Sequence, residues 1–115
     1  MTMTNEPQRV SRLATGWLQG DSDGLMYDAC SDEPEIAWEV ILDILKRDLT
    51  EDQIALLAAG PLEDIIAHHG RAFIDRIERE AKMNSRFNYL LGGIWRRQIS
   101  DDIWGRLEKV RKKVW

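Results

Sequence analysis

The amino-acid sequence predicts an all-α fold, a compact single domain of seven or eight short helices spanning residues 1–115. Apolar residues recur at the 3.6-residue spacing of amphipathic helices, and no segment shows the apolar–polar alternation of a half-buried strand. With 115 residues, of which 43% are hydrophobic, the chain suits a single core. Its tight predicted connections suggest antiparallel helix pairs, as in helical-repeat proteins. Residues 1–7 are expected to form a flexible N-terminus.

Short apolar stripes mark the first two predicted helices. The first stripe, which Gly20 ends, consists of Val10, Leu13, Ala14, Trp17 and Leu18. A second, shorter helix is expected to begin after a cap at Asp21 or Ser22, because aspartate and serine side chains satisfy free backbone N–H groups there. The residues expected to face inward from it are Leu25, Met26, Ala29 and Cys30.

The next helix is the best defined. Asp32 is a suitable cap, Pro34 suits the first turn, and Glu35 stands three residues after Asp32 in the spacing of a capping box. Eight of the ten residues from 36 to 45 are apolar. A polar stripe this narrow predicts a helix that is covered on most sides, and therefore the central element of the domain.

Two capped helices are predicted to follow. Thr50 and Gln53 have the spacing of a capping box at the start of a helix over 50–59. The Gly60–Pro61 junction is expected to end that helix and start another, which ends at Gly70. Because no loop separates the two helices, a sharp corner is predicted between them.

Three more amphipathic helices complete the pattern. The first has an inner stripe of Phe73, Ile74, Ile77 and Ala81. Its outer face carries the i,i+4 ion pairs Asp75/Arg79, Arg76/Glu80 and Glu78/Lys82. Ser85 is expected to cap the second, which bears Phe87, Leu90, Leu91, Ile94 and Trp95, with Gly92-Gly93 allowing close packing. Ser100 is expected to cap the third, where Ile103, Leu107, Val110 and Val114 share a face.

Tryptophan is unusually frequent, with five residues in the chain. Large rings at stripe positions contribute strongly to core burial. At least three of four stripe tryptophans are therefore expected in the core, namely Trp17, Trp38, Trp95 and Trp104. Trp115 follows Arg111, Lys112 and Lys113 and is expected to be free.

Three sequence stretches resemble a family of small bacterial helical proteins of unknown function. They are PEIAWEVILDIL, LLAAGPLEDIIAHHGRAFIDRIEREA and RFNYLLGGIW. The family's pattern runs from a PExAW helix through AAGPLEDLL…HG and FIDRIE to LLGGVW. The resemblance covers roughly residues 11–110 and is most specific from Leu56 to Glu80, whereas the basic end from Arg106 to Trp115 lies outside it. It implies an all-α domain, gives no catalytic residues to carry over and leaves the function open.

Several features predict a cytoplasmic protein. The N-terminal residues have no apolar core of a secretory signal, and the longest apolar run, Ile54 to Ala59, is too short to span a bilayer. Cys30 is the only cysteine, so an internal disulfide and a multi-cysteine zinc site are both excluded.

Charge is distributed unevenly along the chain. Residues 20–64 contain thirteen acidic and two basic side chains, whereas residues 65–115 contain six acidic and twelve basic ones. One explanation is that the acids and bases stabilise helix N- and C-termini respectively. The other is a binding surface in the acidic segment, for which the candidate residues are Asp21, Asp23, Asp28, Asp32, Glu33, Glu51 and Asp52.

The leading functional hypothesis is therefore a non-enzymatic, protein-binding domain that docks an acidic face on a basic partner. Such a protein would be an inhibitor, either an immunity protein against a toxin or a phage-type antagonist that occupies a nucleic-acid groove. No cofactor is expected. Direct nucleic-acid binding is not expected either, because the chain is acidic overall and no aromatic platform interleaves its basic end.

Two alternatives remain. Asp64 and His68 are four residues apart, and with Glu63 they would form a weak metal site of a small metal-dependent enzyme. More simply, histidine near a helix C-terminus pairs with an upstream acid. Glu39 and Asp43 are the only other notable carboxylate pair, and a solvated stripe explains them. The second alternative is an adaptor that binds peptides between helix pairs. The sequence contains no nucleophile elbow and no phosphate-binding loop.

Overall fold

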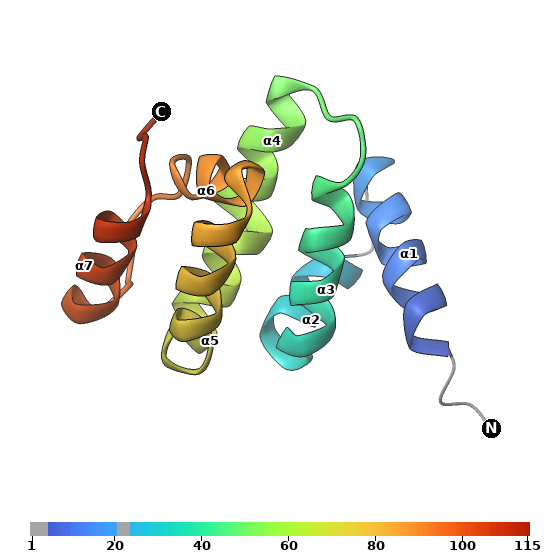
Figure 1. Cartoon of the computed structure of the whole chain (residues 1–115). Coiled ribbons are helices and arrows are strands. Elements are labelled where there is room, and N and C mark those ends of the chain that lie inside the picture. Colours follow the sequence, from blue (N-terminus) through green and yellow to red (C-terminus); the bar gives the residue numbers. More distant parts are fainter. Residues whose placement is uncertain (1–4, 21–23) are drawn as a thin grey trace.

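The computed structural model describes residues 5–20 and 24–115, and within these ranges all regular structure is helical, which confirms the all-α prediction (Figure 1). The elements are α1 (Asn5–Leu18), α2 (Leu25–Asp32), α3 (Pro34–Leu45), α4 (Glu51–Leu57), the π-helical turn η2 (Ala58–Leu62), α5 (Glu63–Met83), α6 (Ser85–Leu91) and α7 (Asp101–Val110). Residues 5–7, expected to be flexible, belong to α1, whereas residues 1–4 lie outside the described residues. None of the helices in these ranges combines the length and hydrophobicity that a membrane span requires.

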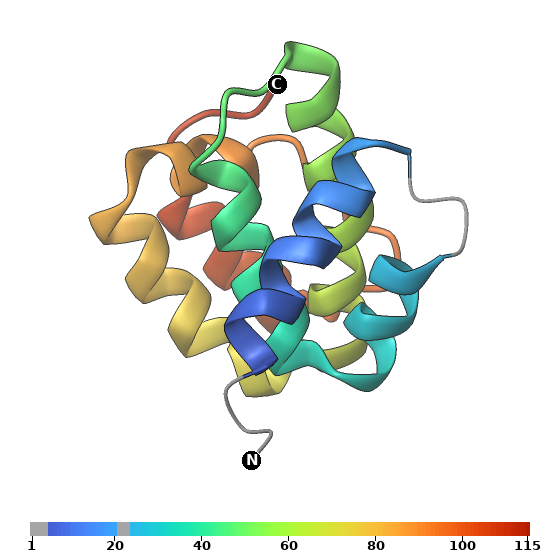
Figure 2. The ribbon, with the colours of Figure 1, turned by 90° about the vertical axis from the view of Figure 1, so that its right-hand side faces the viewer.

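Helix α3 is the central element, as predicted. It lies between α1 on one side and α5 on the other (Figures 1 and 2). Its buried side chains are Ala37, Trp38, Val40, Ile41, Ile44 and Leu45. The most extensive helix contacts join α1 with α3 and α5 with α7, and α1 and α3 run in the same direction. Both of these contacts join helices that are not consecutive in the sequence.

The predicted capping box of α3 is wrong. Glu33 occupies the N-cap position without a side-chain hydrogen bond, and Asp32 is the last residue of α2. The Glu35 carboxylate instead accepts two hydrogen bonds from the guanidinium of Arg76 in α5, at 2.7 and 3.0 Å. A bidentate arginine partner satisfies a carboxylate better than a single backbone N–H group does, so Glu35 joins two helices.

Helix α2 confirms only part of its predicted inner face. Met26, Ala29 and Cys30 are buried, but Leu25 is 54% exposed. Gly24, with a left-handed φ of 70°, precedes the helix without a side-chain cap. The predicted caps, Asp21 and Ser22, lie outside the described residues.

The tryptophan prediction is also wrong. Of the four stripe tryptophans only Trp38 is buried, where its ring packs against Phe73 and Phe87 at centroid distances of 5.8 and 5.3 Å. Trp17 and Trp104 are half-buried at the edge of the core. Trp95 is 71% exposed, because α6 ends at Leu91 and the following loop turns it outward.

No sharp corner forms at the Gly60–Pro61 junction. The chain passes from α4 through η2 into α5, and the wider π-helical turn accommodates Pro61, which has no N–H to donate and would crowd a regular α-helix. The bend occurs later, at His69, where φ and ψ are −136° and 24°. The predicted helix end at Gly70 thus corresponds to a kink inside α5, one residue earlier.

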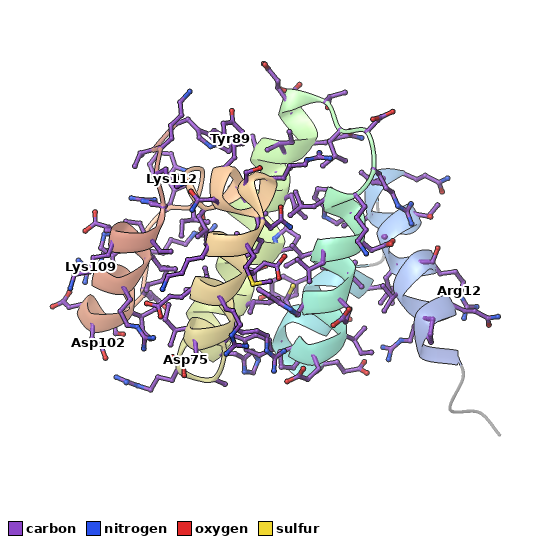
Figure 3. All side chains as sticks on the ribbon, viewed as in Figure 1. Arg12, Asp75, Tyr89, Asp102, Lys109 and Lys112 are labelled. Atoms are coloured by element: carbon purple, nitrogen blue, oxygen red, sulfur yellow. The ribbon has the colours of Figure 1, made fainter. Side chains whose placement is uncertain are left out.

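The ion pairs of α5 connect it to other helices. None of the predicted i,i+4 pairs forms among the described side chains. Instead, Arg106 of α7 contacts both Asp75 and Glu78, each at 2.6 Å. Figure 3 shows Asp75 on the lower end of α5, next to α7. These pairs between helices form in place of the i,i+4 pairs, because α7 positions one guanidinium within reach of two carboxylates of α5.

The N-caps of α6 and α7, and the C-terminal end of α7, differ from the prediction. Asn84, not Ser85, caps α6, since its side chain accepts hydrogen bonds from the backbone of Arg86 and Phe87. Ser100 does occupy the N-cap of α7, but its hydroxyl donates to Asp102 instead of accepting from the backbone. Helix α7 ends at Val110, so Val114 leaves the predicted face and is 66% exposed.

An extended tail, residues 111–115, follows α7 and packs over Gly92 and Gly93. The Trp115 backbone N–H donates to the Gly92 carbonyl at 2.9 Å, and its indole N–H donates to the Tyr89 carbonyl at 2.7 Å. The sequence predicted that Trp115 is free, and this prediction is wrong, because both of its N–H groups are hydrogen-bonded to the α6 region. The two glycines do allow close packing: both receive this tail, and Gly93 also lies against Ala58 of η2.

Candidate functional site

The predicted acidic residues occupy two separate regions. Asp28 and Asp32 are exposed on α2 and Glu33 directly follows it, whereas Glu51 and Asp52 are exposed in the first turn of α4. Helix α3 runs between these regions, and its twelve residues correspond to roughly 18 Å. The remaining two candidates, Asp21 and Asp23, lie outside the described residues. The described acids therefore do not form one continuous face.

These acids also differ in their partners. The Glu33 carboxylate accepts a hydrogen bond from Arg9 of α1 at 2.6 Å, and this bond lowers the pKa of Glu33. The other four described candidates form no ion pair with any side chain that the structure describes. Their charge is thus available to an external partner.

A hollow of about 470 Å³, here called the apolar groove, lies where the end of α1 meets α2, α4 and η2. Its lining residues are Trp17, Leu18, Gly20, Gly24, Met26, Tyr27, Cys30, Gln53, Leu56, Gly60, Pro61 and Asp64. Two large side chains at this groove point into solvent, since Tyr27 is 61% exposed and Leu56 is 63% exposed. Exposed apolar side chains around a hollow are typical of an interaction site.

The local sequence explains why Leu56 is exposed. The run Ile54 to Ala59 is apolar throughout, and a helix cannot turn six consecutive residues toward one core. Leu57 and Ala58 are buried, whereas Leu56 projects outward. Asp52 precedes Leu56 by one helical turn and shares its face, and Asp28 follows Tyr27 on α2. Asp28 and Asp52, which form no ion pair with a described side chain, thus lie on the helices that border the apolar groove, although neither lines it.

The cysteine that lines the apolar groove, Cys30, is an unreactive thiol. The Cys30 thiol is buried and lies 3.5 Å from the Pro61 carbonyl. Burial, followed by the nearby negative charge of Asp64, raises the pKa of Cys30 to about 12. The sulfur is therefore a protonated thiol near neutral pH, and Cys30 is a poor nucleophile and metal ligand.

The Glu63, Asp64 and His68 corner is arranged around an arginine. Glu63 is 1% exposed, its Oε2 accepts a 2.7 Å hydrogen bond from the Trp95 backbone, and Arg97 Nε lies 2.9 Å from its Oε1. Arg97 Nη1 is also 4.0 Å from Asp64. His68 is exposed. Within residues 5–20 and 24–115 there is no group of three side chains arranged to hold a metal ion.

Burial changes the pKa of both carboxylates of this corner. It raises the pKa of Glu63 and the pKa of Asp64, although Arg97 opposes the shift in each case. Arg97 adopts a left-handed φ of 45°, a conformation that residues other than glycine rarely adopt. Glu63 thus anchors the loop that presents the exposed Trp95, and the corner acts as a loop anchor in this structure.

A larger hollow, about 780 Å³, runs along α3 between α1 and the end of α5. It contains the predicted carboxylate pair: Glu39 is exposed, and Asp43 is half-buried and bonded to Arg47 at 2.8 Å. Its lining residues carry both signs of charge, since Lys46 and Arg86 face three carboxylates. Glu39 and Asp43 thus lie on the narrow polar stripe that the sequence predicted.

Sequence reasoning did not identify Tyr27 and Leu56 as surface residues. The signal was present, because neither side chain fits the inner stripe of its helix: Tyr27 lies beside Met26, and Leu56 lies within an over-long apolar run. Trp95 was placed on a helical stripe, although Gly92-Gly93 precedes it and ends α6. Glycine pairs near a predicted helix end would have indicated the loop.

The fold and its grooves define a small all-α domain without a recognised catalytic constellation among the described residues. A family described as "Family of unknown function (DUF6869)" matches residues 6–115. The chain belongs to this family. Comparisons with curated proteins and with solved structures found no match.

Proposed function

We propose that this chain is a non-enzymatic protein-binding domain that receives a basic, partly apolar segment of a partner in the apolar groove. The observation that carries the proposal is an apolar hollow with exposed Tyr27 and Leu56, on two helices that also carry the exposed carboxylates Asp28 and Asp52. Protein interfaces commonly have an apolar centre and a polar rim.

The two parts of the surface would have different roles. Burial of aromatic and large apolar side chains, here Tyr27 and Leu56, supplies most of the binding energy in typical interfaces. Charges at the rim mainly steer the approach of the partner and increase the association rate. Asp64 contributes less, because Arg97 lies 4.0 Å from it and partly compensates its charge.

The proposed occupant is a protein segment with a large apolar side chain flanked by lysine or arginine. Such segments occur on proteins that bind nucleic acids, so an inhibitor of the immunity or phage-antagonist type would use this surface. The proposed role suits the cytoplasm, where the single free cysteine stays reduced.

A second candidate function, that of a peptide-binding adaptor, is favoured by the larger hollow along α3. Its volume of about 780 Å³ and its apolar floor of Val10, Ile36 and Leu42 would accommodate a peptide. However, its lining carries mixed charges, and Asp43 is already paired with Arg47. We therefore rank this hollow below the apolar groove.

The proposal is tested with two synthetic amphipathic peptides of equal length, one with lysines around two leucines and one with glutamates instead. Each is titrated into the isotope-labelled protein, and amide chemical shifts are recorded. The lysine peptide is expected to shift the amides of α2 and α4 preferentially, with an affinity that falls as salt rises from about 0.05 to 0.5 M. Shifts confined to α3 and the end of α5 would instead support the peptide-binding adaptor.

Matched variants give the decisive comparison. Tyr27→Ala with Leu56→Ala should weaken binding of the lysine peptide at least tenfold, whereas Met83→Ala, at a 78% exposed apolar residue outside the groove, should not. Asp52→Lys should slow association more than Glu51→Lys, because Glu51 lies in the same first helical turn but does not share the face of Leu56. If both peptides bind equally, or the groove variants bind as tightly as the parent, the proposal is wrong.

A further inference from the structure

A second surface of opposite charge lies where the end of α5 meets α6 and the tail. A hollow of about 370 Å³, here called the basic hollow, opens between these segments. Its lining residues are Ala81, Lys82, Met83, Ser85, Asn88, Tyr89, Lys112 and Lys113. Three of them are lysines and none is acidic, in a chain whose net charge is −4. None of these lysines takes part in an ion pair with any side chain that the structure describes.

A buried asparagine builds the basic hollow. Asn88 is 4% exposed, and its side-chain amide donates to the Ala81 carbonyl at 3.2 Å and to the Val110 carbonyl at 2.9 Å. Its side-chain oxygen accepts the backbone N–H of Lys112 at 2.9 Å. One side chain thus ties the end of α5, the end of α7 and the tail together. The lysines of α5 and the tail are therefore held on neighbouring backbone segments before any ligand arrives.

Aromatic surface lies directly beside these charges. The rings of Tyr89 and Trp115 stack with centroids 5.1 Å apart and planes 17° apart. Lys113 Nζ lies 6.0 Å from the centre of the Tyr89 ring. Tyr89 and Trp115 are 42% and 40% exposed, and Met83 on the rim is 78% exposed. Figure 3 shows Tyr89 and Lys112 near each other at one end of the molecule, with Lys109 lower on α7.

We propose that the basic hollow binds a nucleoside phosphate, taken either as a free nucleotide or as one unit of a single-stranded nucleic acid. Lysine ammonium groups bind phosphate as point charges, and exposed aromatic rings beside a basic groove stack on bases of any sequence. Lys82 and Lys112 contact the phosphate, while Tyr89 and Met83 border the base. The volume lies within the range of small-molecule sites.

The prediction against nucleic-acid binding was based on two features of the sequence that do not apply to the basic hollow. The basic end of the chain carries no interleaved aromatic platform in sequence, but α6 supplies Tyr89 from elsewhere in the chain. The overall acidity of the protein comes from residues 20–64, not from this surface. Local charge governs a local contact, because screening limits the reach of distant charges to about 10 Å at moderate salt.

The test uses three probes: inorganic phosphate, adenosine monophosphate and a fluorescent single-stranded oligouridylate of about ten nucleotides. Binding is measured at low salt by amide chemical shifts for the small probes and by fluorescence anisotropy for the oligonucleotide. Shifts are expected at residues 81–89 and 112–115. An oligonucleotide that binds at least tenfold tighter than the mononucleotide identifies a nucleic-acid strand as the ligand, and equal affinities identify a free nucleotide. Failure of both to bind, or binding of inorganic phosphate as tight as that of the mononucleotide, overturns the proposal.

Charge-reversal variants locate the site. Lys82→Glu and Lys112→Glu should each weaken binding by roughly tenfold, and Lys82→Gln by less. Lys109→Glu is the matched control, because Lys109 is also exposed and in no ion pair with a side chain that the structure describes, but does not line the basic hollow. It should change the affinity less than about threefold. An equal loss in all three charge-reversed variants would mean nonspecific attraction and would contradict the proposal. Leu56→Ala in the apolar groove should leave nucleotide binding unchanged, so the two proposals can fail separately.

Discussion

Replacement of Gly92 by alanine tests how the tail is held. A methyl group on Gly92 would lie 2.0 Å from the Lys113 carbonyl oxygen and 2.8 Å from Trp115 Cδ1. Both distances are far below van der Waals contact, and the first involves backbone. The backbone of Gly92 itself, with φ −66° and ψ −16°, suits alanine. The tail must therefore move, while the rest of the domain need not.

The expected cost follows from the contacts that the displaced tail would lose. These are the two Trp115 hydrogen bonds, at 2.9 and 2.7 Å, and the stack on Tyr89. Net hydrogen bonds contribute about 0.5–1.5 kcal/mol each and an aromatic pair a similar amount, with the low end appropriate because Trp115 is 40% exposed. Alanine offsets about 0.4–1 kcal/mol by restricting the unfolded chain. Gly92→Ala should therefore destabilise the full chain by about 0.5–1 kcal/mol.

The assay is urea unfolding of four proteins: the parent, Gly92→Ala, a chain ending at Arg111, and that shorter chain with Gly92→Ala. All the colliding atoms belong to residues 113 and 115, so in the shorter chain the substitution should be neutral or stabilising. Gly105→Ala in α7, where a methyl group meets nothing within 4 Å, is the control and should stabilise by up to about 1 kcal/mol. An equal loss of stability in the full and shortened chains would refute this explanation of Gly92.

Two further predictions concern the core and the buried acid. Ile41→Ala on α3, which removes a fully buried side chain, should cost about 2–5 kcal/mol in urea unfolding, whereas Leu25→Ala at an exposed position should be nearly neutral. Burial raises the pKa of Glu63 above its ordinary value of 4.5, so the protonated carboxyl favours folding below that value and the benefit is lost as pH rises. Relative to the parent, Glu63→Gln should therefore gain stability as the pH rises above about 4.5 in unfolding measurements, and a shift in the opposite direction would mean that Arg97 outweighs burial.

The sequence predicted best where apolar periodicity and local caps agreed. Helix α3 was identified as central from its narrow polar stripe, and the capping box of Thr50 and Gln53 forms as predicted. Both signals are local, so they survive folding. The Gly60–Pro61 junction shows the limit of local signals, because a π-helical turn absorbs the proline without ending the helix.

The candidate sites depended on information that the sequence does not contain directly. On α5, Asp75 and Glu78 do not form the expected i,i+4 ion pairs. Both carboxylates instead bind the guanidinium of Arg106 in α7. Likewise, Tyr89 and Lys112 meet because hydrogen bonds of Asn88 and Trp115 join α6 to the tail. Such contacts require the relative placement of helices, and periodicity alone does not specify that placement.

The uneven charge of the chain survives folding. Many charges are cancelled by pairs between helices, such as Arg76 with Glu35 and Arg106 with Glu78. The acids that keep neither an ion pair nor a side-chain hydrogen bond within residues 7–20 and 24–115 are Asp28, Asp32, Glu39, Asp48, Glu51 and Asp52. The lysines of the basic hollow remain unpaired in the same way. If helix-end stabilisation were the sole purpose of these charges, unpaired acids would be confined to first turns, yet Asp32 ends α2 and Asp48 precedes α4. The two surfaces therefore carry opposite charge.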